Sequence, residues 1–276
     1  MRILILDRDE AATTQISARL KTMGHEVEMR KTRDDAQDFL AQNPCPLVFI
    51  DPAPMKDGRL PIQGLRQSAQ SYPYVVLMGD ADSASAEEGA YLKAGANVFL
   101  KKPVDLQELE KVTNEACDFL NLKARLASRE TDFPSGGGVI AKSAFNELFL
   151  SCLDRGERHG EEIFCLFIGM GNYRNLLIDG GDYVARSSAA RLAKELTRIR
   201  RQSDILAQTD DAEFAILLLR SDGISEPIDA ANRFVTTLSV KDDEPLAYQP
   251  GPTPEVTVKL MAFPSGTIHF EKTFAI

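Results

Sequence analysis

Short apolar runs alternate with segments of helical spacing along the first half of this 276-residue chain. The apolar runs predict strands over residues 2–6, 46–50, 74–78 and 97–100, with a weaker strand at 26–29. Apolar positions at helical spacing predict helices over residues 10–23, 33–41, 60–69 and 83–94, and a long helix from 105 onward. Five such strand–helix units predict an α/β fold in which a parallel sheet is wrapped by helices.

Polar residues follow these strands at the edge of the sheet where ligands bind in such folds. They are Asp7, Arg8 and Asp9 after the first strand, Asp51 after the third, Gly79 and Asp80 after the fourth, and Lys102 before Pro103 after the fifth. Over residues 1–120 this pattern resembles the response-regulator receiver family, whose phosphoacceptor aspartate ends strand three, as Asp51 does. The resemblance implies a CheY-like (flavodoxin-like) doubly wound parallel sheet and phosphorylation of Asp51 by a histidine kinase or phosphotransfer protein. It also implies Mg²⁺ as cofactor.

Two positions depart from the family pattern. The family has an acidic pair after strand one, and here Asp7 is followed by Arg8. Asp9 is the nearest acid that could replace the second member of the pair, but its side chain points elsewhere at a regular strand end. The expected metal ligands are therefore Asp7 and Asp51. The family's hydroxyl residue after strand four falls at Gly79. Two interpretations stay open: regulated phosphorylation of Asp51, or a carboxylate held by Lys102 and by Arg8, which permanently supplies the charge of the metal.

The second half predicts a different order of elements. Helices are predicted over 142–155 and 226–238 and a helix-rich segment up to Arg200, with strands over 163–168, 256–261 and 267–274. Residues 241–255 contain four prolines and are predicted to form a loop. Two short apolar segments flank the acidic turn at Asp210-Asp211-Ala212-Glu213-Phe214, which predicts a β-hairpin.

This hairpin resembles that of the diguanylate cyclase (GGDEF) family, which has Gly-Gly-Asp/Glu-Glu-Phe at the turn. The resemblance covers residues 132–276 and implies a nucleotidyl-cyclase-like α+β domain. Cyclase chemistry needs two divalent cations, and the family's metal carboxylates fall at Gly169, Gly171 and Ala212. The turn glycines are replaced by Asp210 and Asp211, which repel a triphosphate. Asp182 resembles the guanine-reading aspartate. Glu213 remains at the turn, and alone it cannot hold the metals. We therefore expect no cyclase activity and no catalytic residues.

A neighbouring motif matches the family in full. Arg201-Gln202-Ser203-Asp204 is followed by five residues and then Asp210, which is the spacing of the family's inhibitory R-x-x-D site. Arg233 resembles the second arginine of that site. The resemblance implies that cyclic di-GMP binds through Arg201, Asp204 and Arg233, because guanidinium groups suit phosphate oxygens and guanine edges. The alternative is a helix-end cap and salt bridge, or a solvated basic helix end.

These patterns predict three segments: a receiver domain over 1–120, a helical linker over 121–131 and a degenerate GGDEF domain over 132–276. Asp105 is a good N-cap for the helix that leads into the linker, and nothing breaks that helix before residue 132. The helix is either a stalk that pairs with a second copy, giving a homodimer, or an ordinary terminal helix packed on its own sheet. The Pro/Gly-rich stretch over 132–138 marks the domain boundary.

Composition narrows the functional classes. The net charge is −9 and neither half has an excess of Lys and Arg, which argues against duplex nucleic acid as a partner. No run of about 18 apolar residues predicts a membrane span. There is no signal peptide, and four scattered cysteines fit a reducing cytoplasm. We expect either a cyclic di-GMP-binding effector or a ligand-independent scaffold that docks other signalling proteins.

Overall fold

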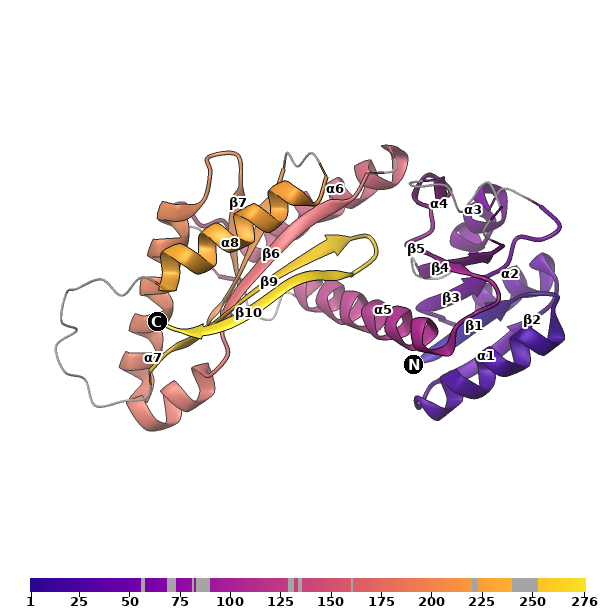
Figure 1. Cartoon of the computed structure of the whole chain (residues 1–276), viewed down its shortest axis with the longest axis horizontal. Coiled ribbons are helices and arrows are strands. Elements are labelled where there is room, and N and C mark those ends of the chain that lie inside the picture. Colours follow the sequence, from indigo (N-terminus) through magenta and orange to yellow (C-terminus); the bar gives the residue numbers. More distant parts are fainter. Residues whose placement is uncertain are drawn as a thin grey trace. The chain divides into compact units, whose positions relative to one another are not determined.

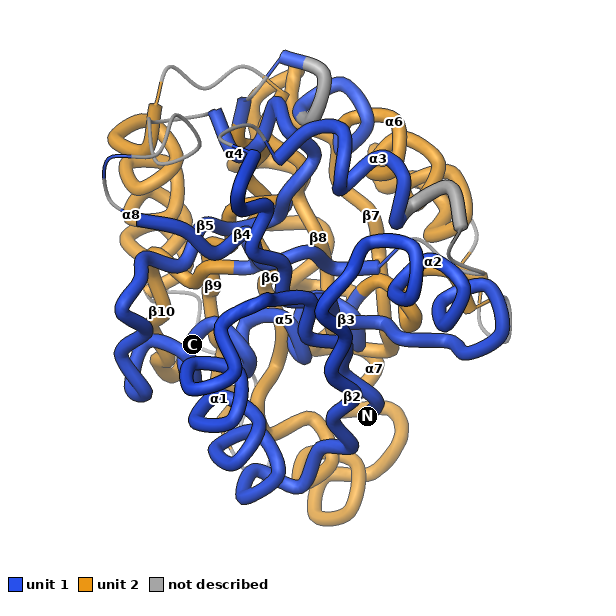
Figure 2. The backbone as a smooth tube through the Cα atoms, turned by 90° about the vertical axis from the view of Figure 1, so that its right-hand side faces the viewer, with its two compact units in different colours: residues 1–122, 153–161, 264–266 blue, residues 123–152, 162–263, 267–276 orange. Residues whose placement is uncertain are grey.

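The computed structural model describes residues 1–55, 58–68, 73–80, 82, 90–128, 132–133, 136–159, 161–219, 223–239 and 253–276. The chain forms two compact units (Figure 2), each described by itself below. Unit 1 comprises residues 1–122, 153–161 and 264–266, and unit 2 comprises residues 123–152, 162–263 and 267–276. Most of the helix predicted over 83–94 and most of the loop predicted over 241–255 lie outside the described residues, as do parts of the Pro/Gly-rich boundary.

Unit 1 contains a five-stranded parallel sheet with strand order β2-β1-β3-β4-β5, surrounded by helices (Figure 1). Its elements are β1 (Arg2–Leu6), α1 (Glu10–Thr22), β2 (Glu26–Arg30), α2 (Arg33–Gln42), β3 (Leu47–Ile50), α3 (Arg59–Ser68), β4 (Tyr74–Gly79), α4 (Ala90–Lys93), β5 (Val98–Lys101) and α5 (Leu106–Ala127, up to residue 122). The predicted doubly wound sheet is confirmed, and all five predicted strands match within one residue. Every residue of β3 and β4 is buried, which explains their continuous apolar runs.

Helix α5 begins as the sequence predicts, because the Asp105 side chain accepts a hydrogen bond from the Gln107 N–H at 3.0 Å. The expectation that it continues unbroken to residue 131 is wrong for the described part. The helix ends at Ala127, and Ser128 is no longer helical although its N–H still donates to the Ala124 carbonyl. Leu109, Val112 and Ala116 are buried in α5, so this half packs as an ordinary terminal helix does.

Unit 2 contains a five-stranded antiparallel sheet with strand order β10-β9-β6-β8-β7. Its elements are α6 (Lys142–His159, in its first part), β6 (Ile163–Met170), α7 (Tyr173–Ile199), β7 (Ile205–Asp210), β8 (Glu213–Leu218), α8 (Ser225–Ser239), β9 (Glu255–Phe263) and β10 (Ile268–Ala275). The predicted hairpin is confirmed as β7 and β8, and the predicted final strand as β10. Unit 2 is therefore a sheet-rich α+β region.

The two faces of this sheet are covered by different helices. On one face, alternate strand residues such as Leu166 and Ile216 form a core with α7 and α8. On the other face, the Phe149 ring of α6 meets the Phe263 ring of β9 edge-on, with centroids 4.9 Å apart. Helix α7 is kinked at Gly181, whose φ of 81° lies in the left-handed region that glycine accepts without strain.

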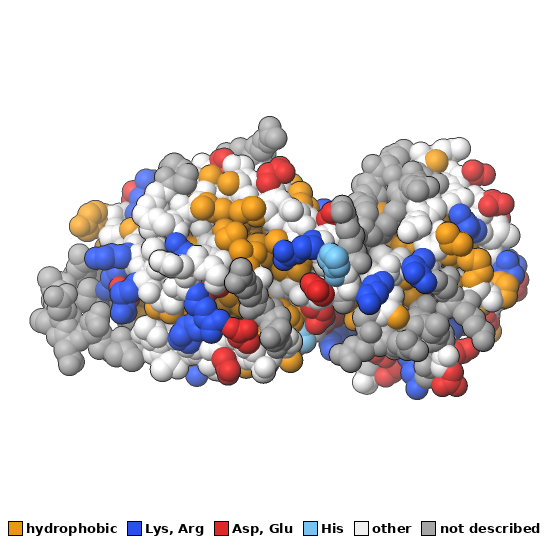
Figure 3. Space-filling model, turned by 90° about the horizontal axis from the view of Figure 1, so that it is seen from above, with side chains coloured by type: hydrophobic (Ala, Val, Ile, Leu, Met, Phe, Trp, Pro, Cys, Tyr) orange, Lys and Arg blue, Asp and Glu red, His pale blue; other side chains and the backbone are white. Residues whose placement is uncertain are grey.

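Within the described residues, no helix is both long enough and apolar enough to cross a membrane. On the face that Figure 3 presents, Lys and Arg side chains are interspersed with Asp and Glu, and hydrophobic side chains gather in one area of unit 2. This face therefore carries charges of both signs.

Candidate functional site

The carboxyl edge of the parallel sheet brings Asp7, Asp51 and Lys102 together. The strand ladder positions them: the Asp51 N–H donates to the Leu6 carbonyl at 2.8 Å, and the Lys102 N–H donates to the Gly79 carbonyl at 2.8 Å. The Lys102 ammonium lies 2.7 Å from the Asp7 carboxylate and also hydrogen-bonds the Asp51 carboxylate. One cation thus joins two carboxylates from different strands. None of the three side chains is more than 14% exposed.

This geometry keeps the lysine charged. Burial alone would lower the pKa of Lys102, but the hydrogen bond to Asp51 and the charge of Asp7 outweigh burial and raise the pKa above its ordinary value. Asp51 is fixed further by the Ala53 N–H, which donates to its Oδ1 at 2.8 Å. Lys102 is therefore the cationic partner of both carboxylates, while Asp7 Oδ2 makes no hydrogen bond among the described residues.

The two neighbours of this cluster do not add ligands for a metal. Asp9 caps α1, where its Oδ1 accepts hydrogen bonds from the Ala11 and Ala12 N–H groups at 3.0 and 3.2 Å. Arg8 is exposed and places a positive charge where the family has an acid. Among the described residues, no group of three or more His, Cys, Asp or Glu side chains is arranged to hold a metal ion. The described residues of this pocket do not fit the divalent cation that the family resemblance implies.

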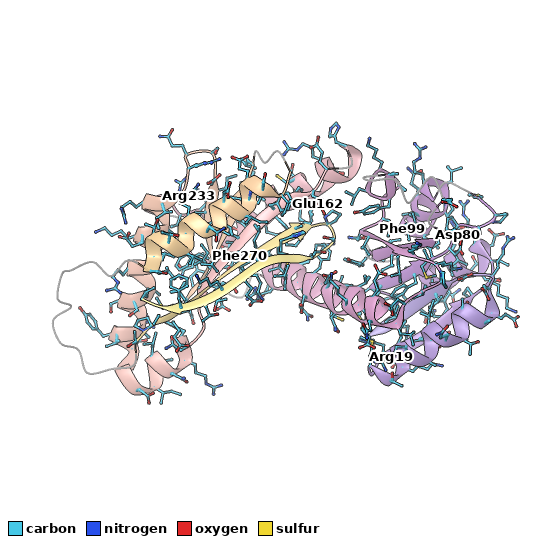
Figure 4. The ribbon with its side chains drawn as sticks, viewed as in Figure 1. Arg19, Asp80, Phe99, Glu162, Arg233 and Phe270 are labelled. Carbon is cyan, nitrogen blue, oxygen red and sulfur yellow. The ribbon has the colours of Figure 1, made fainter. Side chains whose placement is uncertain are left out.

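The remaining receiver positions lie near the same edge. Gly79 ends β4 and contributes only its backbone, while Asp80 directly after it is exposed (Figure 4). Phe99 on β5 is partly buried against the core of unit 1. The sequence thus located the edge correctly, and the structure adds Lys31 and Arg33 to the pocket, which spacing to the family motifs did not suggest.

In unit 2, Arg201, Asp204 and Arg233 line one shallow pocket together with Glu226. Arg201 and Asp204 come from the segment between α7 and β7, and Arg233 from α8 (Figure 4). Asp204 is 6% exposed and accepts the Arg201 N–H at 3.1 Å, so the R-x-x-D spacing closes a tight turn. The three residues predicted for cyclic di-GMP therefore meet at one place.

The two arginines of this pocket differ in their partners. Arg201 forms an exposed ion pair with Glu226, and that hydrogen bond raises the pKa of Arg201. The Nη2 atom of Arg233 is buried and makes no hydrogen bond within the described part of the chain. A buried guanidinium nitrogen without a hydrogen-bond partner is uncommon, and such a donor is satisfied by ordered water, an ion or a ligand. Sequence reasoning missed Glu226, because only folding brings the first turn of α8 beside Arg201.

The hairpin turn lacks the acids that the GGDEF family uses for metal binding. Glu213 makes two contacts with the Arg125 guanidinium, at 2.9 and 3.1 Å, and accepts the Thr209 hydroxyl at 2.8 Å. A side chain at Gly169 would place its Cβ 3.3 Å from the Ala212 carbonyl oxygen, which is tighter than most real contacts. The described residues at the turn therefore do not fit a two-metal centre. The role of Arg125 was not predictable from spacing.

A cavity of about 400 Å³ lies beside this turn. Asp182 and Asp211 line it with Tyr173 and Arg186, and Arg186 donates to Asp182 at 2.8 Å. Burial and then the nearby Asp211 raise the pKa of Tyr173, as expected next to negative charge. These acidic groups disfavour a triphosphate at this position.

Comparison with known proteins bears on the first half of the chain. Residues 3–114 match the response regulator receiver domain, and this part of the chain is a receiver domain. The response regulator MprA of Mycolicibacterium vanbaalenii is 31% identical over 162 residues, which covers 58% of this chain and 64% of that protein. The chain thus spans less than two thirds of that relative's length.

Two solved structures each resemble part of the chain. A receiver domain of a sensor histidine kinase from Pseudomonas aeruginosa, solved with a magnesium ion in its active site cleft, is 22% identical. The match covers 40% of this chain and 92% of that structure, with a TM-score of 0.35. A GGDEF-domain fragment from P. aeruginosa is 21% identical and covers 44% of this chain and 70% of that structure, with a TM-score of 0.37.

Proposed function

We propose that this receiver-containing protein is a cyclic di-GMP effector, in which unit 2 binds the dinucleotide without synthesising it. The observation that carries the proposal is the pocket shared by Arg201, Asp204 and Arg233. Two guanidinium groups offer donors to phosphate oxygens, and the carboxylate accepts donors from a guanine edge. The unpartnered Nη2 of Arg233 supports a ligand at this place.

Ligand entry requires Arg201 to leave Glu226. Because that pair is exposed, it is weak compared with the charge-assisted bonds that a phosphate offers. Asp204 needs less rearrangement, since its carboxylate is already held by the Arg201 N–H. The weak Arg201–Glu226 ion pair therefore closes the pocket, and the Asp204 carboxylate is already fixed as an acceptor.

We also propose that unit 2 is not a cyclase. Gly169 and Ala212 provide no carboxylates, and Glu213 is bound to Arg125 rather than available for a cation. A histidine kinase or phosphotransfer protein acts upstream on the receiver domain, and the signal passes on to another signalling protein or to a second copy of the chain. A ligand-independent scaffold is the competing function.

Calorimetric titration of cyclic di-GMP into the full chain tests this proposal. We expect micromolar binding, about −8 kcal/mol, that is abolished by Arg201→Ala. Arg198→Ala is the matched control, because Arg198 lies on the last turn of α7 but pairs with Glu195 and does not line the pocket. No binding by the wild-type chain, or equal losses in both variants, supports the scaffold instead.

A further inference from the structure

The receiver pocket is small and carries more basic than acidic side chains. It is a cavity of about 90 Å³, and its lining includes Asp7, Asp51, Arg8, Lys31 and Arg33. A water molecule occupies about 30 Å³ in the liquid, so the cavity has room for one small tetrahedral ion.

The charges in this pocket balance without a metal. Lys102 and Arg8 offset the two carboxylates of Asp7 and Asp51. Lys31 is paired with the exposed Glu10, and Arg33 adds a further positive charge. A divalent cation would therefore enter a site that already has a positive excess, whereas an anion would be attracted.

The two arginines that line this pocket, Arg8 and Arg33, have guanidinium donors available. Among the residues that the structure describes, neither Arg8 nor Arg33 forms an ion pair with a carboxylate. They come from separate segments, Arg8 from the end of β1 and Arg33 from the start of α2, and line the cavity together with Asp51. Guanidinium forks of this kind are suited to tetrahedral oxyanions.

We propose that this pocket binds a phosphate-class oxyanion through Arg8 and Arg33 without a divalent cation. The oxyanion is either free in solution or carried on Asp51, since both present the same oxygens to the same side chains. In the second case, an Asp51 oxygen attacks the phosphorus of a phosphodonor such as acetyl phosphate. The bond from phosphorus to the bridging oxygen breaks, and acetate leaves with the electron pair.

The test uses the full chain in EDTA with two probes. Inorganic phosphate is titrated by calorimetry, and acetyl phosphate labelling is followed by intact-protein mass spectrometry. We expect phosphate binding that Mg²⁺ does not improve and that Arg8→Ala weakens by about tenfold, as for loss of one charged hydrogen bond. Arg2→Ala is the matched control, because Arg2 lies at the opposite end of β1 and pairs with Glu26.

A second variant, Arg8→Asp, restores the acid of the family pattern. We expect it to lose phosphate binding in EDTA and to gain Mg²⁺ binding, with an unchanged circular dichroism spectrum. A covalent adduct formed in EDTA identifies Asp51 as the carrier, and phosphate binding without an adduct identifies the free ion. The proposal is overturned if neither probe reacts in EDTA, if either requires Mg²⁺, or if Arg2→Ala has the same effect as Arg8→Ala. Cyclic di-GMP binding in unit 2 is unaffected by either result.

Discussion

Replacement of Lys102 by methionine removes the cation that joins Asp7 to Asp51. The Asp7 side chain is 2% exposed and the Asp51 side chain 12%, so both carboxylates lose their partner in a site with little access to water. At 2.7 Å and an effective dielectric constant of about 20, one such pair attracts by about 6 kcal/mol before desolvation is subtracted. Breaking a buried pair typically costs about 3–5 kcal/mol, and we expect a loss in this range for unit 1.

Hydrogen exchange read by mass spectrometry is the suitable assay, because two units need not unfold in one transition. Peptides from β3 and β4 report on unit 1, and we expect their exchange to accelerate by at least about two orders of magnitude. Lys101→Met is the matched control, since Lys101 is the preceding residue but is exposed. Equal exchange in the Lys101 and Lys102 variants would refute the reasoning.

Three further predictions concern both units. Glu226→Ala frees Arg201 of its competing carboxylate, and we expect cyclic di-GMP affinity measured by calorimetry to rise by up to about fivefold. The raised pKa of Lys102 means that its contribution to the stability of unit 1 is fully present below pH 10.5 and is lost as the pH rises through the folded-state pKa. Hydrogen exchange of β3 peptides in alkaline buffers, corrected for the intrinsic exchange rate, measures this loss of stability. Gly169→Asp crowds the Ala212 carbonyl and cannot complete a metal site, so incubation with GTP and Mg²⁺ should yield no cyclic di-GMP by chromatography.

Strand ends were the most predictable part of the fold. The continuous apolar runs of β3 and β4 predict that Asp51 and Gly79 lie at one edge, because parallel strands share their carboxyl edge. Helix ends were less predictable. The last apolar position at helical spacing is Leu126, but no proline or glycine directly follows Ala127, where α5 ends, so the sequence predicts a helix that continues to residue 131.

Contacts between distant segments could not be predicted from spacing. Glu226 pairs with Arg201 and Arg125 pairs with Glu213 only because the fold brings separate helices to the hairpin. The sequence also left open what Asp9 does, and its role as the N-cap of α1 depends on local backbone geometry. Motif spacing therefore located the sites, while the partners that determine their charge came from the fold.

The most direct test of the central claim is the affinity of cyclic di-GMP for the wild-type chain and for Arg233→Ala, measured side by side by equilibrium dialysis. Arg233 comes from α8, outside the R-x-x-D motif, and contributes the buried guanidinium nitrogen that has no hydrogen-bond partner within the described residues. We predict micromolar binding by the wild-type chain and a loss of about tenfold or more in the variant. Identical affinities, or no binding by either protein, would contradict the account.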